Sequence, residues 1–227
     1  MLPLAADEIE VVPFLLDTDD SVSLSEAESW LSPGEQERAA AFRFPVHRDR
    51  YIRGRGMVRK VLSEHTGEAP GSFGFSLGER GKPYLQEGEL HFNLSHSEEY
   101  AVFAVSKLPS VGIDIERFDR KVDVPGLSKR CFRPSETERI ERMTGEEKIR
   151  AFFWTWTAKE ARMKATGEGF GLEPKKIEIS FGEEHPEDCL HPIDPKVYLN
   201  AVSLPGWQVA CTLAATHPFR VRLRSLP

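Results

Sequence analysis

The sequence predicts an α+β fold of two similar lobes related by a pseudo-twofold axis, each with a long helix packed on an antiparallel sheet. The first observation is a repeat, because Pro33 to Arg38 recurs about one hundred residues later as Pro134 to Arg139. The second is that each copy leads into a long helical pattern that ends at a Thr-Gly pair, Thr66-Gly67 or Thr166-Gly167. The third is that short apolar runs, separated by glycine and proline, follow each helical pattern, as in antiparallel strands and their turns.

The predicted strands follow from these apolar runs. In the first half they are Phe73 to Leu77, His91 to Leu94 and Tyr100 to Ser106, and in the second half Ile177 to Phe181, Tyr198 to Ser203 and Trp207 to Ala214. Gly78 to Pro83 and Pro205-Gly206 are typical of hairpin turns. Lys107 to Ser110 is expected to link the lobes, which assigns residues 1–109 to an N-terminal lobe and 110–227 to a C-terminal lobe. A cleft between lobes is a natural ligand site.

Two acidic residues alternate with isoleucines in the run Val111 to Glu116. Side chains alternate between the faces of a strand, so Asp114 and Glu116 are expected on one exposed face and Ile113 and Ile115 in the core. An isolated Asp-x-Glu pair on a strand is more often a solvated edge than a metal site. Its meaning therefore depends on a third acid nearby.

The run Trp156 to Lys164 predicts a helix, since Ala151 to Trp154 leads into residues of high helix propensity. A spacing of four places Glu160 and Lys164 on neighbouring turns of one face. If this face meets the acidic strand, three carboxylates and a lysine converge. Carboxylate oxygens suit Mg²⁺, which completes its coordination with water and substrate phosphate.

Composition limits the class of protein. The chain has 227 residues, of which 40% are hydrophobic and 29% charged, as in a globular protein with a real core. No apolar stretch approaches a membrane span, and acids stand where a signal peptide needs basic residues, so a cytoplasmic location is expected. Cys131, Cys189 and Cys211 lack the spacing of a disulfide framework or a zinc site.

Basic residues are concentrated in one segment of a chain whose net charge is −6. The segment runs from Arg38 to Lys60 and contains one acid, Asp49. Its basic residues are Arg38, Arg43, Arg48, Arg50, Arg53, Arg55, Arg59 and Lys60. The pattern indicates a local anion site rather than a nucleic-acid surface, which normally needs a basic domain. The alternative is a solvated helix face without a ligand.

The segment Asn93 to Ser97 places a serine next to a histidine between apolar runs. Neighbouring residues of a strand point to opposite faces, so Ser95 is badly placed for activation by His96 and a hydrolase pair is not predicted. Together with Lys82, these side chains suit phosphate binding. The alternative is a structural turn or cap.

Phe181 to Pro195 is acidic and proline-rich, which predicts an exposed loop. His185, Cys189 and His191 lie within it at spacings that a metal could use. No fourth ligand stands nearby at a usual spacing, so a metal site is not predicted there.

Taken together, these motifs resemble those of the Sfp-type 4′-phosphopantetheinyl transferases. Gly112 to Glu116 matches the family's G-I-D-I-E segment, and Trp156 to Lys164 matches its W-x-x-K-E-[AS]-x-x-K segment. Asn93 to Ser97 and Gly81 to Pro83 match two further family elements in the expected order. The likeness runs from about Ser32 to about Ala215 and includes the two-lobed repeat.

The resemblance implies transfer of the 4′-phosphopantetheine arm of coenzyme A to a serine of an apo acyl or peptidyl carrier protein, with release of adenosine 3′,5′-bisphosphate. It implies that Asp114, Glu116 and Glu160 hold Mg²⁺. Glu160 would take the serine proton, directly or through a metal-bound water, and Lys164 would stabilise or protonate the leaving phosphate. The residues expected to bind the phosphates of coenzyme A are Lys82, Ser95, His96, Lys164 and Arg38.

Two positions depart from the family pattern. Glu35 stands where the family has a first lysine for the 3′-phosphate, which leaves Arg38 as the match to the second. Tyr51 stands where the family has a small hydroxyl residue near the bound nucleotide. Arg50 and Arg53 are therefore further candidates for the 3′-phosphate contact.

Two other functions stay open at this point. A catalytically silent module that binds coenzyme A or a carrier protein would not need all three carboxylates. A Mg²⁺-dependent nucleotide phosphohydrolase would share the metal site but needs no surface for a carrier protein. Two lobes on one chain predict a monomer. No nucleic-acid or membrane partner is expected. Nothing in the sequence names the carrier protein or the pathway.

Overall fold

The computed structural model describes residues 2–19, 21–79, 81–167, 174–180, 191–192 and 197–225. Helices and strands are mixed along the chain, so the predicted α+β class is confirmed. The helices are α1 (Leu24–Ser29), α2 (Pro33–Ala40), α3 (Pro45–Thr66), α4 (Val124–Cys131), α5 (Pro134–Arg142) and α6 (Gly145–Thr166), with 3₁₀ turns at Pro70–Ser72 and Pro174–Lys176. The strands are β1 (Glu8–Leu15), β2 (Phe75–Leu77), β3 (Pro83–Leu85), β4 (His91–Ser97), β5 (Tyr100–Ser106), β6 (Val111–Arg117), β7 (Ile179–Ser180), β8 (His191–Pro192), β9 (Tyr198–Ala201), β10 (Val209–Ala215) and β11 (Arg220–Leu223).

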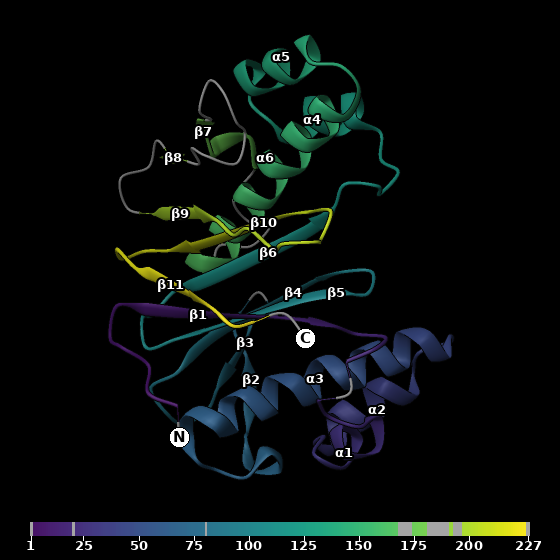
Figure 1. Ribbon diagram of the computed structural model, residues 1–227, viewed down its shortest axis with the longest axis vertical. Coiled ribbons are helices and arrows are strands. Elements are labelled where there is room, and N and C mark those ends of the chain that lie inside the picture. The colour runs from purple at the N-terminus through teal and green to yellow at the C-terminus, as the bar shows by residue number, and fades with distance from the viewer. Residues whose placement is uncertain are drawn as a thin grey trace.

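Two sheets form the centre of the molecule (Figure 1). The first has the strand order β11-β1-β5-β4, and the second has the order β6-β10-β9. Helix α3 packs on the first sheet and helix α6 on the second, as predicted. The first sheet is mixed rather than antiparallel, because the last strand of the chain, β11, runs parallel to β1.

The strands β1 and β5 are buried on both faces. Val12 and Phe14 of β1 pack towards α3, whereas Ile9 and Val11 pack towards Ile113 of the second sheet. The layers therefore follow the order α3, first sheet, second sheet, α6 (Figure 1). A strand buried on both faces lacks the alternation of apolar and polar residues that the sequence analysis used, and β1 was missed for this reason.

The two long helices match each other in length and ending. Each has 22 residues and ends before a glycine with left-handed backbone, Gly67 (φ 80°) or Gly167 (φ 71°). Each also follows a short helix, α2 or α5, that begins with proline. The predicted turn after β2 is confirmed, since β2 pairs with β3 and the N–H of Gly78 donates to the carbonyl of Lys82.

A buried cation fixes α2 to α3 in the first half. The carboxylate of Glu35, in the first turn of α2, accepts hydrogen bonds from the N–H of Ser32 (2.9 Å) and from Nη2 of Arg59 on α3 (2.6 Å). Nη1 of Arg59 donates to the carbonyls of Pro70 (3.0 Å) and Phe73 (3.1 Å). Arg59 is 1% exposed, so Glu35 neutralises a charge that is shielded from water. We call Glu35, Arg59 and the carbonyls of Pro70 and Phe73 the N-terminal clasp.

The second half contains the same arrangement. The carboxylate of Glu136, in the first turn of α5, accepts from the N–H of Arg133 (2.8 Å) and from Nζ of Lys159 on α6 (2.7 Å). Lys159 also donates to the carbonyls of Pro174 (3.1 Å) and Ile177 (2.5 Å), and it too is 1% exposed. This C-terminal clasp repeats the contacts of the N-terminal clasp, except that the second carboxylate oxygen pairs with Arg55 in Glu35 and accepts from the N–H of Ile179 (2.8 Å) in Glu136.

Cys131 and Cys211 are free thiols and are buried, and Cys189 lies outside the described residues. Of the predicted loop Phe181 to Pro195, the structure describes the backbone of His191 and Pro192 as strand β8, which pairs with β7. His185 lies outside the described residues. Within the described ranges, every helix is too short or too polar to cross a lipid bilayer.

Candidate active site

Strand β6 and helix α6 approach each other most closely at Gly112. A Cβ atom at this position would lie 2.2 Å from the carbonyl oxygen of Ala161 and 2.4 Å from the backbone nitrogen of Ala165. No side chain fits there, so glycine is required for α6 to pack this closely. Asp114 and Glu116 follow on the same face of β6, opposite the part of α6 that carries Glu160 and Lys164.

The shared face of Asp114 and Glu116 is buried, and the expectation that it is exposed was wrong. The two residues are only 6% and 9% exposed. Helix α6 covers this face, and β4 runs alongside β6. The expectation assumed a strand with one solvated face, whereas β6 lies inside a layered core.

The two carboxylate oxygens of Asp114 differ in their surroundings. Oδ1 accepts from Oγ of Ser95 (2.8 Å) and from Nζ of Lys164 (2.6 Å). Oδ2 is buried and has no hydrogen-bond partner. A buried oxygen without a donor is costly, so it marks a position where a cation would be stabilised.

The other two carboxylates complete an acidic group around Asp114. Glu116 accepts from Oγ of Ser97 (2.7 Å) and from the guanidinium of Arg120. Burial, together with the negative charges of Asp114 and Glu116, raises the pKa of Glu160 to about 7. The three carboxylates are therefore close enough to repel one another, as like charges in one site do.

The three carboxylates do not form a ready-made metal site. Within the described part of the chain, no three Asp, Glu, His or Cys side chains are grouped closely enough to hold a metal ion. Lys164 contacts Asp114, and Arg120 contacts Glu116, so cations of the protein partly neutralise the acids. The donor set nevertheless fits Mg²⁺, because every donor is a carboxylate oxygen and Oδ2 of Asp114 is unpartnered.

Two lysines donate to backbone carbonyls at the edge of β6. Nζ of Lys164 donates to the carbonyl of Ile113 (3.1 Å) and to Oγ of Ser95 (3.1 Å). Nζ of Lys82 donates to the carbonyls of Val111 and Lys164, both at 2.7 Å. Burial and the nearby charge of Lys164 lower the pKa of Lys82 to about 8. Lys164 therefore stands next to Asp114, and Lys82 stands next to Lys164, which gives an anionic substrate two cations near the acids.

A cavity of about 350 Å³ opens beside Lys82. The hairpin of β2 and β3, His91 at the start of β4 and Thr166 at the end of α6 line it. Burial and the charge of Lys82 lower the pKa of His91. The cavity offers space for a ligand next to the predicted phosphate contacts.

Ser95 and His96 point to opposite faces of β4, as predicted. Ser95 is 6% exposed, whereas His96 lies at the surface. Oγ of Ser95 donates to Asp114 and accepts from Lys164 and from the N–H of Ile115 (3.4 Å). The one donor and two acceptor positions of this hydroxyl are therefore all used within the protein. Partial burial and the charges of Lys164 and Arg50 lower the pKa of His96.

The three arginines expected near the 3′-phosphate differ in their engagement. Arg50 donates to Asp17 (2.8 Å) and Glu98 (2.9 Å), and Arg53 donates to a backbone carbonyl, that of Asp19 (2.9 Å). Arg38 is exposed, lies 5.7 Å from the centre of the Tyr51 ring, and has no carboxylate partner among the residues described. Arg38 is therefore the most available of the three for an incoming anion.

Ser97 and Arg120 were not among the predicted site residues, although both contact Glu116. For Ser97 a signal was present, because Asn93, Ser95 and Ser97 alternate with the same period of two as Gly112, Asp114 and Glu116. Arg120 follows Glu116 by four residues outside any predicted helix, so no pattern pointed to it.

Comparisons with known proteins agree with the nature of this site. Residues 19–108 match the family model for the N-terminal part of 4′-phosphopantetheinyl transferases, and residues 110–212 match that of the 4′-phosphopantetheinyl transferase superfamily. The 4′-phosphopantetheinyl transferase HetI of Nostoc sp. is 38% identical over 221 residues, which cover 91% of this chain and 92% of HetI. The 4′-phosphopantetheinyl transferase of Bacillus subtilis is 29% identical over 155 residues, 68% of each chain.

The likeness to HetI spans nearly the whole chain, and β6 and α6 lie inside the segment that matches the superfamily. A match of this extent and identity establishes common family membership. The chain belongs to the 4′-phosphopantetheinyl transferase superfamily, a family of enzymes that transfer the 4′-phosphopantetheinyl group.

Proposed function

We propose that this transferase moves the 4′-phosphopantetheine arm of coenzyme A to a serine of an apo acyl or peptidyl carrier protein. The serine oxygen bonds to the phosphorus next to pantetheine, the pyrophosphate bond breaks, and adenosine 3′,5′-bisphosphate leaves. One observation carries the assignment of the reacting centre. Asp114, Glu116 and Glu160 come together with Lys164 where β6 meets α6.

Asp114, Glu116 and Glu160 are the residues that would hold Mg²⁺. Bound there, Mg²⁺ would neutralise charge on the pyrophosphate and orient the reacting phosphorus. The unpartnered Oδ2 of Asp114 and the raised pKa of Glu160 support this choice. Both indicate that cations and hydrogen-bond donors of the protein do not fully neutralise the negative charge of the site.

Glu160 and Lys164 have the proton-transfer roles in this proposal. Glu160 takes the proton of the carrier serine, directly or through a bound water, because its carboxylate lies beside Asp114 and Lys164 at the reacting centre. Lys164 donates to the oxygens of the leaving phosphate. Its ammonium group already lies at hydrogen-bond distance from Asp114, so it stands next to the reacting centre.

The phosphates of coenzyme A would be bound by Lys82, Ser95, His96 and Lys164, with Arg38 at the 3′-phosphate and Arg50 and Arg53 beside it. Ser95 would exchange its hydrogen bond to Asp114 for one to a phosphate oxygen. The cavity supports the contact of Lys82, which lines it. The partners of Arg50 and the availability of Arg38 favour Arg38 as the main contact. Glu35 is an acid and supplies no cation here, and its carboxylate is already paired with Arg55 and Arg59.

We also infer two lobes, residues 1–109 and 110–227, related by a pseudo-twofold axis and active as a cytoplasmic monomer. The matching clasps support the repeat, since each ties a short helix, a long helix and a 3₁₀ turn through one buried cation. The separate family matches on either side of residue 109 support the division. Strand β11 qualifies it, because this last strand lies in the first sheet.

The proposal is tested by measuring transfer to an apo carrier protein with Asp114→Ala, Glu116→Ala and Glu160→Ala. Each variant is expected to lose transfer while circular dichroism shows a retained fold, because a metal ligand stabilises the transition state rather than the core. The loss should be smallest for Glu116→Ala, since water can replace one carboxylate on Mg²⁺. Near wild-type turnover of Asp114→Ala or Glu160→Ala at saturating Mg²⁺ would refute the metal assignment.

A further inference from the structure

The two sheets are joined by side chains rather than by backbone pairing. Strand β4 is the edge of the first sheet and β6 the edge of the second. The N–H groups of Ile113, Ile115 and Arg117 all donate to side chains of β4. Their acceptors are Oδ1 of Asn93 (2.8 Å), Oγ of Ser95 (3.4 Å) and Oγ of Ser97 (3.2 Å), in that order. Three side chains spaced by two residues therefore replace the ladder that a further strand would form.

The carbonyl groups of the same edge are also satisfied by side chains. Lys82 donates to the carbonyl of Val111, and Lys164 donates to that of Ile113. An unpaired strand edge inside a protein would leave these polar groups without partners, at a cost in stability. The polar side chains thus hold β4 and β6 at a fixed separation.

Two of the three side chains of β4 that accept from the backbone of β6 make a second contact. Ser95 accepts from the N–H of Ile115 and donates to Asp114, and Ser97 accepts from the N–H of Arg117 and donates to Glu116 (2.7 Å). Asn93 faces a different neighbour, because the residue before Ile113 is Gly112, which has no side chain. Each serine therefore links a carboxylate to the backbone that carries it, and the asparagine links backbone alone.

We propose that Ser97 is a positioning residue that orients the carboxylate of Glu116 for the metal ion. Its hydroxyl can donate only one hydrogen bond, and that bond goes to Oε2 of Glu116. Oγ of Ser97 itself accepts from the N–H of Arg117 (3.2 Å), so the hydroxyl is held in place and fixes the orientation of the Glu116 carboxylate to which it donates. Groups that hold metal ligands in this way tune metal affinity without touching the metal.

Ser97 gives a cleaner test than Ser95, because Ser95 also contacts Lys164 and is a candidate phosphate contact. The inference rests on the proposed metal role of Glu116. The measurement is the dissociation constant of Mn²⁺, used in place of Mg²⁺, by electron paramagnetic resonance in the presence of coenzyme A. Thermal unfolding of the same samples reports stability separately.

Ser97→Ala is expected to weaken Mn²⁺ binding by about 10- to 100-fold, as removal of a group that orients a metal ligand typically does. Asn93→Ala is the matched control, because it removes one hydrogen bond between β4 and β6 without removing a contact to a carboxylate. It should lower the melting temperature but leave Mn²⁺ affinity within about twofold of wild type. Ser97→Thr retains the hydroxyl and should restore affinity. Ser97→Cys, which is close in size and a weak donor, replaces Ser97→Ala if that variant does not fold.

A double-mutant cycle tests whether Ser97 acts through Glu116. In a Glu116→Ala background, Ser97→Ala should cause no further loss of Mn²⁺ affinity. Equal Mn²⁺ affinity of wild type and both Ser97→Ala and Ser97→Cys would overturn the positioning role while leaving the proposed function intact. Absence of Mn²⁺ binding by the wild type would instead overturn both.

Discussion

At the residue scale, Glu160 combines a function with a cost in stability. Its ordinary pKa is near 4.5, and burial with the charges of Asp114 and Glu116 raises it to about 7. The folded protein therefore holds a proton between these values that the unfolded chain releases. Stability falls as pH rises through this window, and the full cost is present above pH 7.

Glu160→Gln is expected to raise the melting temperature of the metal-free protein at pH 8, because the amide carries no charge to bury. The gain over wild type should shrink as pH falls from about 7 to about 4.5, where Glu160 becomes protonated in both states. The measurement is thermal unfolding with a chelator across this pH range. A melting temperature of Glu160→Gln that stays equal to that of wild type at pH 8 would show that neither burial nor the neighbouring carboxylates destabilise the charged form of Glu160.

At the element scale, the repeat could be predicted from the sequence but the clasps could not. Pro33 and Pro134 begin matching helices, and Gly67 and Gly167 end them, because these residues act through local backbone preferences. The clasps depend on pairs distant in the sequence, and the cation is arginine in one and lysine in the other.

The same limit applies to the site. The shared face of Asp114 and Glu116 follows from the alternation of a strand, whereas its burial depends on where α6 packs. Strand β11 was missed because it is short and pairs with the strand nearest the other end of the chain. Local patterns therefore predict which side chains share one face of a strand, whereas tertiary packing decides which element covers that face.

The C-terminal clasp predicts a large loss of stability on removal of its acid. Glu136→Ala leaves the buried ammonium of Lys159 without a counter-charge, which typically costs about 3 to 5 kcal/mol in free energy of unfolding. The measurement is urea denaturation. Glu141→Ala, which removes an exposed partner of Lys129, is the control and should change stability little.

The double variant Glu136→Leu/Lys159→Met should recover much of that loss, since apolar residues of similar size often replace a buried ion pair without penalty. Glu35→Ala should destabilise the first half in a comparable way, because it removes the carboxylate partner of both Arg59 and Arg55. A loss below about 1 kcal/mol in Glu136→Ala would contradict the structural role of the clasp.

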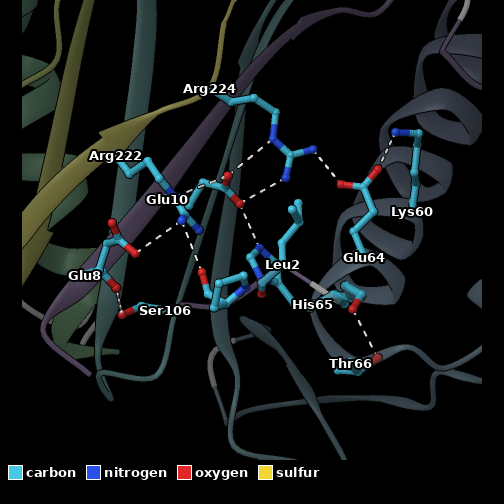
Figure 2. Close-up of polar contacts among 12 residues, drawn as sticks. Leu2, Glu8, Glu10, Lys60, Glu64, His65, Thr66, Ser106, Arg222 and Arg224 are labelled. Carbon is cyan, nitrogen blue, oxygen red and sulfur yellow. Dashed lines mark hydrogen bonds and ion pairs between the residues drawn. The ribbon is translucent and has the colours of Figure 1, made fainter. Parts of the chain in front are cut away.

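At the scale of the whole molecule, one ion cluster holds the two ends of the chain together (Figure 2). Glu10 of β1 accepts from His65 at the end of α3 (2.7 Å) and from Arg224 after β11 (3.0 Å). Arg224 also donates to Glu64 of α3 (2.6 Å). Three segments that are far apart in the sequence therefore meet at one buried carboxylate.

This cluster predicts a loss of stability in acid. Burial alone would raise the pKa of Glu10, but the hydrogen bonds and charges of His65 and Arg224 lower it to about 2 from an ordinary value near 4.5. The resulting stabilisation is fully present above pH 4.5 and is lost as pH falls towards 2. Glu10→Gln should therefore cost about 2 to 3 kcal/mol at pH 7, and the difference from wild type should shrink below pH 4.5.

Asp7→Asn is the matched control for Glu10→Gln, because it weakens an exposed ion pair, with Arg220, between the same two strands. It should change the free energy of unfolding little at any pH. Urea denaturation of both variants between pH 3 and pH 7 makes the comparison. Equal effects of the two substitutions at pH 7 would mean that the buried cluster adds nothing to the pairing of β1 with β11.

The most direct test of the proposed reaction is the intact mass of an apo carrier protein after incubation with this chain, coenzyme A and Mg²⁺. The account predicts a gain of about 340 Da, the mass of the phosphopantetheine arm, together with release of adenosine 3′,5′-bisphosphate. The gain should disappear with a chelator and with Asp114→Ala. Coenzyme A that is cleaved without a mass gain on any of several carriers would indicate a phosphohydrolase, and coenzyme A that is bound but left intact would indicate a silent binding module. Either result would contradict the account.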